Sequence, residues 1–496
     1  MDCFIGLDIG TSSVKGMLLS EKAIVKTASR EYPLYYPKDG WSEQNPQDWY
    51  DGSISVIKEL VSDIDRNSVV SISFSGQMHG LVVLDENDNV IRPAILWNDS
   101  RSSRETEYLN NVIGKETLQQ NTGNIAFSGF TAPKILWLKN NEPKNFQKAE
   151  KIMLPKDYVA YRLSGVFATD CSDAAGTLYF DTKNRRWSEP MLSVLGIGEK
   201  NLPKVYESYQ TVGTLKKSAV DKLGLNENVK IVIGAGDNAA SAVGTDTIES
   251  GDCNISLGTS GTIFVASDEF DYVPNGAIHT FCSAAGKYHY LACILSAASC
   301  HKWWIEGITK SSYDGGFTEY IGKSQVMFLP YLMGERSPIN DAGARAMFIG
   351  MSMDTRRQDL VQAMLEGVAF GLRDSLEEAR KMGIPITRSG LCGGGAKSPL
   401  WRRIVCNVMN LPLDLTASEQ GPGMGGAMLA MVAGGAYPTV AEACKALVRI
   451  EERVMPDPKL VRRYEDRYRA FRRIYPACKE LFPALRCGDT ERREQP

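Results

Sequence analysis

The chain has 496 residues, which is too many for one hydrophobic core, so two or three domains are expected. Hydrophobic residues make up 43% and charged residues 23% of the sequence, as in ordinary globular proteins. A formal net charge of -3 gives no electrostatic basis for binding nucleic acid or acidic membranes. The sequence also lacks an apolar run of about 18 residues or more, so a membrane-spanning class is excluded.

The start of the chain shows no secretory signal, which would need a basic segment followed by an apolar one. The 11 cysteines are scattered, with neither a CxxC pair nor a cysteine and histidine cluster at zinc-ligand spacing. They are typical of small buried side chains in a reducing compartment, and the odd number agrees with this. We therefore expect a cytoplasmic protein.

The beginning of the chain alternates between strand and helix signals, which favours the α/β class. A strand over 4–7, the turn Gly10–Ser13 and a second apolar stretch over 14–19 predict a β-hairpin. A helix is predicted to follow over 46–60, with Asn45 as its N-cap.

Two further strands flank the loop 75–80, and the helix-rich stretch 100–225 looks like an insertion that builds a pocket wall. A buried strand over 229–233 then runs into the turn Gly234–Asn238 and a short helix. The second half repeats the plan with a hairpin over 253–266 and, later, a strand that leads into glycines. We expect two domains and a flexible tail, over residues 1–246, 247–480 and 485–496.

The two predicted hairpins carry nearly the same turn, with Thr11, Ser12 and Ser13 in the first and Gly258 and Thr259 in the second. Successive backbone N–H groups with hydroxyls beside them form a concavity suited to an anion such as phosphate. One such turn would be weak support for phosphate binding. Two at equivalent places suggest a nucleoside triphosphate held between two related domains.

Asp8 stands at the end of the first strand, just before the first turn. A carboxylate there would repel phosphate unless a cation lay between them, so Asp8 is a candidate Mg²⁺ ligand, directly or through water. The alternative is a turn-forming aspartate that bonds local backbone. The second hairpin has Ser256 at the matching place, so only one half supplies this carboxylate, as one metal ion would require.

Asp237 follows a hydrophobic strand and precedes a small-residue helix. Ligands of α/β proteins bind at the carboxyl ends of strands, so this carboxylate is placed to accept the proton of a hydroxyl that attacks phosphorus. The alternative is an N-cap of the following helix. The neighbouring Asn238 can donate and accept hydrogen bonds to a polyol.

Met78 and His79 occupy the loop between the two strands. His79 either orients a sugar hydroxyl or is a histidine bonded to local backbone. Gly394 and Gly395 follow the second-half strand and precede a helix, where glycine lets a nucleotide approach the backbone. The run is neither a Walker A loop nor a clean GxGxxG fingerprint.

Several stretches are similar to the signatures of one enzyme family: 129–141, and 346–351 together with 359–366. Over about residues 4–475 the chain resembles the FGGY carbohydrate kinases, and within them the members that act on D-xylulose. The segments that carry the finer resemblance are Trp41–Gln44, Gly76–Gly80, Ile95–Asp99, Leu154–Tyr158, Ser172–Thr177 and Gly334–Pro338. The family's usual Gly-Pro-Ala-Leu-Gly-Ala-Ala stretch differs here, at 421–427.

The resemblance implies two ribonuclease-H-like domains of the actin and hexokinase type around a deep cleft that binds the sugar. It implies transfer of the γ-phosphoryl group of ATP to D-xylulose, giving D-xylulose 5-phosphate in pentose catabolism. The N-terminal domain would hold the sugar and the C-terminal domain the nucleotide. Relatives also suggest a homodimer.

The resemblance also assigns roles to the residues singled out above. Asp237 matches the proton acceptor and Asp8 the acidic residue beside Mg²⁺ and phosphate. The expected sugar contacts are Met78, His79, Asp237 and Asn238. The expected ATP and phosphate contacts are Thr11, Ser12, Ser13, Gly258, Thr259, Gly394 and Gly395.

Two other functions stay open from the sequence. One is a related kinase that acts on ribulose, another ketose or glycerol, since a pocket that reads hydroxyls discriminates weakly. The other is an actin-like protein that senses a sugar or nucleotide without catalysis. The presence of Asp8 and Asp237 with both hairpins argues against the sensor, which has no need of a base.

Overall fold

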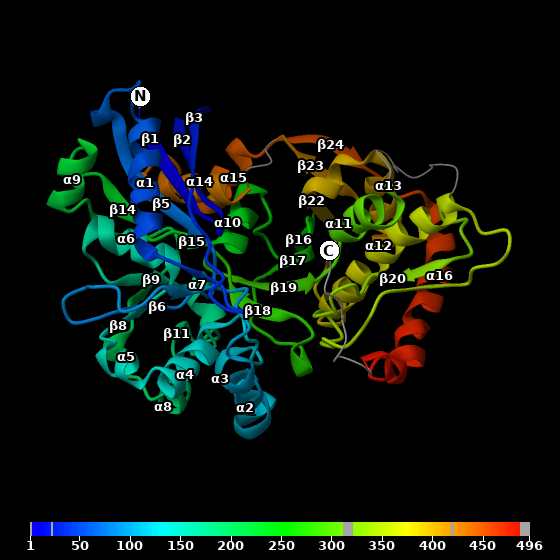
Figure 1. The fold of residues 1–496 in the computed structure, drawn as a ribbon. Helices are drawn as coiled ribbons and strands as arrows, with labels where there is room; N and C mark the ends of the chain where they lie inside the picture. Colours follow the sequence, from blue (N-terminus) through cyan, green and yellow to red (C-terminus); the bar gives the residue numbers. More distant parts are fainter. Residues whose placement is uncertain (1, 21–22, 311–320, 418–420, 487–496) are drawn as a thin grey trace. The chain divides into compact units, whose positions relative to one another are not determined.

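The computed structural model describes residues 2–20, 23–310, 321–417 and 421–486 (Figure 1). Residues 487–496, most of the expected tail, lie outside the described residues. The contacts divide the chain into two compact units, neither of which is continuous in sequence. The first unit combines 1–249, 266–289 and 420–449, and the second combines 250–265, 290–419 and the chain from 450 onward.

The first unit is built on a mixed sheet with the strand order β13-β14-β5-β1-β2-β3. β1 (Cys3–Ile9) and β2 (Ser13–Ser20) form the predicted antiparallel hairpin, and β3 (Ile24–Glu31) pairs antiparallel with β2. β1 and β5 (Val69–Gly76) are parallel, which requires a crossover, and helix α1 (Pro46–Leu60) lies within it. The hairpin and the helix are confirmed.

Helix α1 shows why the crossover packs as it does. The side chain of Asn45 accepts a hydrogen bond from the Gln47 N–H at 3.1 Å, so the predicted N-cap is confirmed. Trp49, Ile57 and Leu60 are fully buried and belong to the same hydrophobic core as the apolar residues of β1. Burial of this apolar face stabilises the helix against the sheet.

The rest of the first unit contains the expected helix-rich insertion, drawn mostly in cyan and green-blue in Figure 1. The remaining strands and helices of the first unit are β4 (Glu43–Gln44), β6 (Val82–Leu84), β7 (Ala94–Ile95), α2 (Ser103–Tyr108), α3 (Lys115–Thr122), α4 (Thr131–Asn141), α5 (Pro143–Lys148), β8 (Lys151–Met153), α6 (Pro155–Ser164), β9 (Ala168–Asp170), α7 (Cys171–Ala174), β10 (Phe180–Asp181), β11 (Arg186–Trp187), α8 (Glu189–Leu195), β12 (Lys204–Tyr206), β13 (Thr211–Thr214), α9 (Lys217–Leu223), β14 (Lys230–Val232), β15 (Ala235–Gly236), α10 (Asp237–Gly244), β18 (His279–Cys282), α14 (Gly421–Gly434) and α15 (Val440–Leu447).

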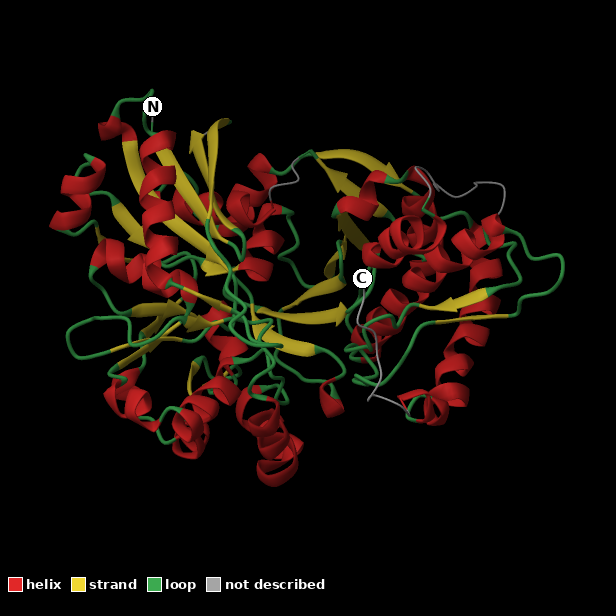
Figure 2. Ribbon diagram, viewed as in Figure 1, coloured by secondary structure: helices red, strands yellow, loops and turns green. Residues whose placement is uncertain are grey.

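The second unit repeats the arrangement, with strands in the order β19-β17-β16-β22-β23-β24. β16 and β17 form the second predicted hairpin, and β16 is parallel to β22, which is parallel to β23. The order matches β3-β2-β1-β5-β14 of the first unit, and Figure 2 shows helices packed beside the strands in both. The α/β class is confirmed.

The strands and helices of the second unit include one helix of 25 residues, α12. They are β16 (Asp252–Leu257), β17 (Gly261–Ser267), β19 (Tyr288–Ile294), α11 (Ala298–Lys302), β20 (Met327–Leu329), β21 (Met347–Ile349), α12 (Arg357–Lys381), β22 (Arg388–Cys392), α13 (Pro399–Met409), β23 (Leu413–Thr416), β24 (Ile450–Val454) and α16 (Pro458–Cys478).

Helix α14 comes late in the sequence but packs in the first unit, where its orange ribbon lies beside the blue β1 (Figure 1). The contact is backbone against backbone. A Cβ atom on Gly6 would lie 2.3 Å from the Ala427 nitrogen, and one on Gly425 would lie 1.8 Å from the Ala240 oxygen in α10. Both distances are impossible for real atoms, so these positions require glycine.

We predict that Gly425→Ala lowers the free energy of unfolding by about 1–3 kcal/mol or more, because the new methyl group forces α14 away from α10. The control is Gly423→Ala in the same helix, where a Cβ meets no atom of the described residues within 4 Å. That change leaves stability unchanged or raises it by up to about 1 kcal/mol, since alanine favours helix. Thermal unfolding of both variants tests the contrast, and equal midpoints would refute it.

Candidate active site

The first unit brings several of the predicted residues to one edge of its sheet. β1, β5 and β15 are parallel, and Ile9, Gly76 and Gly236 lie side by side in register. The turn after β1, the loop after β5 and Asp237 after β15 therefore leave the sheet at the same level. The carboxyl ends of parallel strands are where α/β proteins bind ligands.

The first predicted phosphate turn is held by its carbonyl oxygens. Tyr32 donates its hydroxyl to the Gly10 oxygen and its backbone N–H to the Ser12 oxygen, and the Gln44 amide donates to the Thr11 oxygen at 2.7 Å. The Gly10 N–H donates to the Ser13 oxygen at 3.0 Å, which closes the turn.

The hydroxyl of Thr11 is also bonded, donating to the Gln77 amide oxygen at 3.2 Å and accepting from the Trp97 ring N–H at 3.0 Å. Gln77 directly precedes the predicted sugar-contacting pair. This bond ties the turn after β1 to the loop after β5.

Asp8 is half-buried in β1 and accepts a hydrogen bond from the Ser75 hydroxyl at 3.1 Å. Burial raises the pKa of Asp8 above its ordinary value, although the Ser75 hydroxyl and the charge of Lys15 oppose the rise. A nearby cation would favour the ionised form. The environment of Asp8 therefore suits a carboxylate that is ionised when a cation is bound next to it.

Asp237 is the first residue of α10, and the N-cap of this helix is Gly236. The N-cap interpretation of Asp237 is therefore wrong. Its Oδ1 accepts from the backbone N–H of Asn238 at 2.7 Å and from the side-chain amide of the same residue at 3.0 Å. Burial and then the negative charge of Asp8 raise the pKa of Asp237 to about 7, against the opposing backbone bond.

The predicted sugar-side residues also meet in the first unit. The Asn238 amide nitrogen lies 3.8 Å from the Met78 sulfur, and His79 Nδ1 donates to the Gly176 oxygen at 2.7 Å. The imidazole lies against the Phe130 ring, with centroids 4.7 Å apart. His79 has a φ of 68°, a left-handed conformation that is uncommon for a residue with a Cβ and often marks a functional loop.

The second unit gathers the other predicted residues at the equivalent edge. β16 ends before Gly258, and its Ser256 pairs with Cys392 at the end of β22. Gly393, with a φ of 88°, lies so close to the hairpin that a Cβ would fall 2.8 Å from the carbonyl carbon of Leu257. The second turn and the glycine run with Gly394 and Gly395 are thus adjacent.

The carbonyls of the second turn are engaged in the same way as those of the first. The Gly258 oxygen accepts from the Ala298 N–H at 2.8 Å. The Thr259 oxygen accepts from the N–H groups of Ala297 and Ser299, at 3.0 and 3.2 Å. Both predicted phosphate turns are therefore fixed by hydrogen bonds to their backbone carbonyl oxygens.

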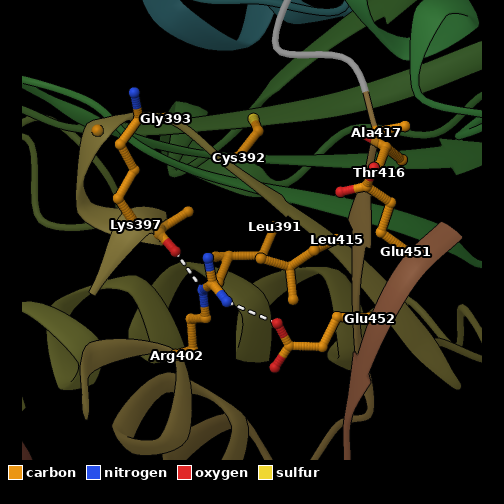
Figure 3. A pocket seen from close by; sticks show the side chains of 12 residues that line it. Leu391, Cys392, Gly393, Lys397, Arg402, Leu415, Thr416, Ala417, Glu451 and Glu452 are labelled. Atoms are coloured by element: carbon orange, nitrogen blue, oxygen red, sulfur yellow. Dashed lines mark hydrogen bonds and ion pairs between the residues drawn. The ribbon is translucent and has the colours of Figure 1, made fainter. Parts of the chain in front are cut away.

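A pocket of about 580 Å³ opens at the ends of β22 and β23, within the range of small-molecule sites (Figure 3). Gly393 and Gly394 line it on one side and Thr416 on another. Arg402 on α13 donates to the Ala396 oxygen and to Glu452, the latter at 2.7 Å. These two lining side chains were not predicted, because an arginine and a glutamate 50 positions apart carry no sequence signal of proximity.

Within the described ranges, no three histidine, cysteine, aspartate or glutamate side chains gather into a metal-binding group. A single carboxylate such as Asp8 still fits Mg²⁺, which keeps several waters and takes further oxygen ligands from substrate phosphates. The cysteines of the described residues are buried or partly buried. None of the described helices combines the length and apolar character that crossing a bilayer requires.

The two matching sheets and their Gly-Thr-Ser turns define a duplicated ribonuclease-H-like fold of the actin type, with acidic and glycine-rich edges suited to phosphoryl transfer. The model of the FGGY family of carbohydrate kinases matches the chain, its N-terminal domain over residues 3–244 and its C-terminal domain over 253–434. The protein belongs to this family of carbohydrate kinases, for which ATP is the co-substrate.

Individual relatives agree with the family. The xylulose kinase of Escherichia coli strain K12 is 36% identical over 489 residues, covering 97% of this chain and 100% of the relative. A crystal structure of a xyloylose kinase from Brucella ovis has a TM-score of 0.92 at 37% identity, covering 97% of this chain and 100% of that one. A gluconate kinase from Lactobacillus acidophilus reaches 0.93 at 27% identity, with 98% and 99% covered.

We predict that Asp237→Asn raises the thermal unfolding midpoint at pH 8, because the ionised carboxylate is held half-buried near Asp8. The folded pKa of about 7 lies above the unfolded value of roughly 3.9, so wild-type stability falls as pH rises between the two. The gain in the variant is therefore full above pH 7 and absent below about pH 4. Each unit of pKa shift corresponds to about 1.4 kcal/mol. A gain that does not depend on pH would contradict this account.

Proposed function

We propose that this carbohydrate kinase phosphorylates D-xylulose at its terminal hydroxyl, giving D-xylulose 5-phosphate in pentose catabolism. The observation that carries the proposal is the shared sheet edge in the first unit, where Asp237 lies near Asp8 and its neighbour Asn238 lies against Met78. Full-length similarity to proteins named xylulose kinase supports the choice of substrate.

The proposed division of labour follows the two halves of the sequence. Residues 1–246 would bind the sugar and supply the first phosphate turn and the base, while residues 247–480 would bind the nucleotide. Thr11, Ser12 and Ser13 in the first half, and Gly258 with Thr259 in the second, would direct N–H groups toward phosphate oxygens. Gly394 and Gly395 line or border the pocket of the second unit, which supports a nucleotide there.

In the proposed reaction, the substrate hydroxyl oxygen attacks the γ-phosphorus, its proton passes to the Asp237 carboxylate, and ADP leaves. A pKa of about 7 matches a base that must accept and then release a proton near neutral pH. Bound Mg²⁺ would neutralise charge on the phosphoryl oxygens, and Asp8 would hold it directly or through water. Met78, His79 and Asn238 would orient the sugar.

We predict that Asp237→Ala lowers kcat by roughly 10²–10⁴-fold, the usual contribution of a general base, and leaves sugar binding measurable. The wild-type rate should also fall below pH 7, where the carboxylate is protonated. Release of ADP, followed by a coupled assay, measures both. A variant with wild-type kcat would show that Asp237 is not the base.

A second candidate function is phosphorylation of another ketose or polyol, such as ribulose or glycerol. The structural similarity to a gluconate kinase favours keeping it, because one fold serves several sugar acids and sugars. The same ADP-release assay with D-xylulose, D-ribulose, glycerol and gluconate decides between them by their kcat/KM values. If none of these compounds gives ADP release, the result would instead support a protein that senses a sugar or nucleotide without catalysis.

We further predict that Gly394→Val raises the KM for ATP by about 10-fold or more and changes the KM for the sugar little. A Cβ at Gly394 meets no atom of the described residues within 4 Å, yet this glycine lines the pocket, so the added side chain occupies ligand space. An unchanged unfolding midpoint is the control for folding. An unchanged KM for ATP would place the nucleotide elsewhere.

The homodimer and the cytoplasmic location are part of the same proposal; the first comes from the resemblance to relatives and the second from the scattered cysteines of the sequence. Size-exclusion chromatography with light scattering tests the dimer, and fractionation of cells tests the location.

A further inference from the structure

A buried cluster of charges lies in the helix-rich part of the first unit, and the proposed reaction does not use it. Lys156, at the start of α6, is fully buried. Its Nζ lies 2.6 Å from Asp157 and 2.8 Å from Asp170, with Asp173 at 3.5 Å. Burying four ionisable groups is costly, so the cluster calls for a function or for strong compensation.

A chain of hydrogen bonds leads from this cluster toward the base. The second carboxylate oxygen of Asp170 accepts from the Ser172 hydroxyl at 2.5 Å and from the Ser172 N–H at 2.8 Å. The hydroxyl oxygen of Ser172 in turn accepts a hydrogen bond from the backbone N–H of Gly236 at 3.1 Å. Gly236 directly precedes Asp237, so the chain ends at the turn that carries the carboxylate.

We propose that Ser172 is a positioning residue for the phosphoryl-transfer base: held by the buried pair of Asp170 and Lys156, its hydroxyl anchors the Gly236 N–H and so fixes the backbone that presents Asp237. This role requires no contact between Ser172 and the substrate or the reacting atoms. Ser172 acts through the orientation of the next turn.

The sheet alone holds this turn weakly, which is why a separate anchor matters. β15 contains two residues and pairs with the end of β5. Gly236 is also packed closely, because a Cβ there would lie 2.9 Å from the Met78 side chain. The backbone at this point therefore governs both the base and one of the proposed sugar contacts.

The segment that carries Ser172 also reaches the other side of the proposed sugar site. Gly176, four residues later, accepts the hydrogen bond from His79. Lys156 packs against the end of β5, directly before the loop that carries His79, since a Cβ on Gly76 would lie 2.8 Å from the Lys156 Cβ. One buried segment thus supports the turn of Asp237 and the loop of His79.

The electrostatics agree with a charged Lys156. Burial alone would lower the pKa of Lys156, but the surrounding carboxylates raise it above its ordinary value. Burial raises the pKa of Asp173 well above its ordinary range, against the effect of Lys156, and the charge of Asp237 adds to the rise.

The test compares Ser172→Ala with Ser208→Ala. Both serines are fully buried and donate to the same oxygen of Asp170, the Ser208 hydroxyl at 2.6 Å. In the described residues, only the Ser172 hydroxyl also bonds to Gly236. Both variants therefore lose the bond to Asp170, while loss of the bond that positions Gly236 is confined to Ser172→Ala.

We expect Ser172→Ala to lower kcat for sugar phosphorylation on the order of 10- to 100-fold, as for a displaced catalytic group, with the KM for ATP unchanged. Ser208→Ala should keep kcat within about 3-fold. Equal losses of kcat in the two variants, or a change confined to KM, would overturn the proposal.

Ser172 has this role only if Asp237 is the base, so a second measurement is independent of activity. Hydrogen exchange followed by mass spectrometry on peptides covering 234–238 should be faster in Ser172→Ala than in wild type or Ser208→Ala. Unchanged exchange would overturn the anchor itself. Faster exchange in an enzyme that phosphorylates no tested sugar would instead keep the anchor and reject the proposed function.

Discussion

Two half-buried carboxylates of like charge, Asp8 and Asp237, are held near each other at one edge of a sheet. β1, which contains Asp8, and β15, which directly precedes Asp237, are both parallel neighbours of β5. Their ends lie in register, so the chain cannot separate the two groups without breaking the sheet. Burial, and after it the negative charge of Asp8, raise the pKa of Asp237 to about 7. Proteins often hold such electrostatic strain at functional sites, where the surrounding packing compensates for it.

The duplication of the fold bears on the proposed phosphate binding more than on the proposed chemistry. Both sheets have the same strand order, and both Gly-Thr-Ser turns are fixed through their carbonyl oxygens by the rest of their own unit. The acidic residues are not duplicated, because Ser256 stands where the first hairpin has Asp8. The duplicated turns thus suit the triphosphate of ATP, in which the phosphate group is repeated. The carboxylates that occur in only one half suit the single proton transfer of the proposed reaction.

Local patterns in the sequence predict the hairpins, helix α1 and its Asn45 cap, because these depend on residues close together in the chain. The same patterns place Asp8 and Asp237 at strand ends. They leave the N-cap alternative for Asp237 open, which is wrong because Gly236 takes that position. The packing of α14 into the first unit was not predictable, since no local signal shows that Gly425 touches Ala240, 185 residues earlier in the chain.

The buried polar network was hidden from the sequence for a related reason. Lys156, Asp170 and Ser172 are residue types that usually lie at the surface, and their burial follows from how the insertion packs against β15 and the end of β5. A short β15 supplies few ladder hydrogen bonds, so the direction of Asp237 must be set from outside the sheet. The sequence predicts the insertion only as a pocket wall; in our proposal it is also the support that the duplicated core lacks at the point where the reaction is proposed to occur.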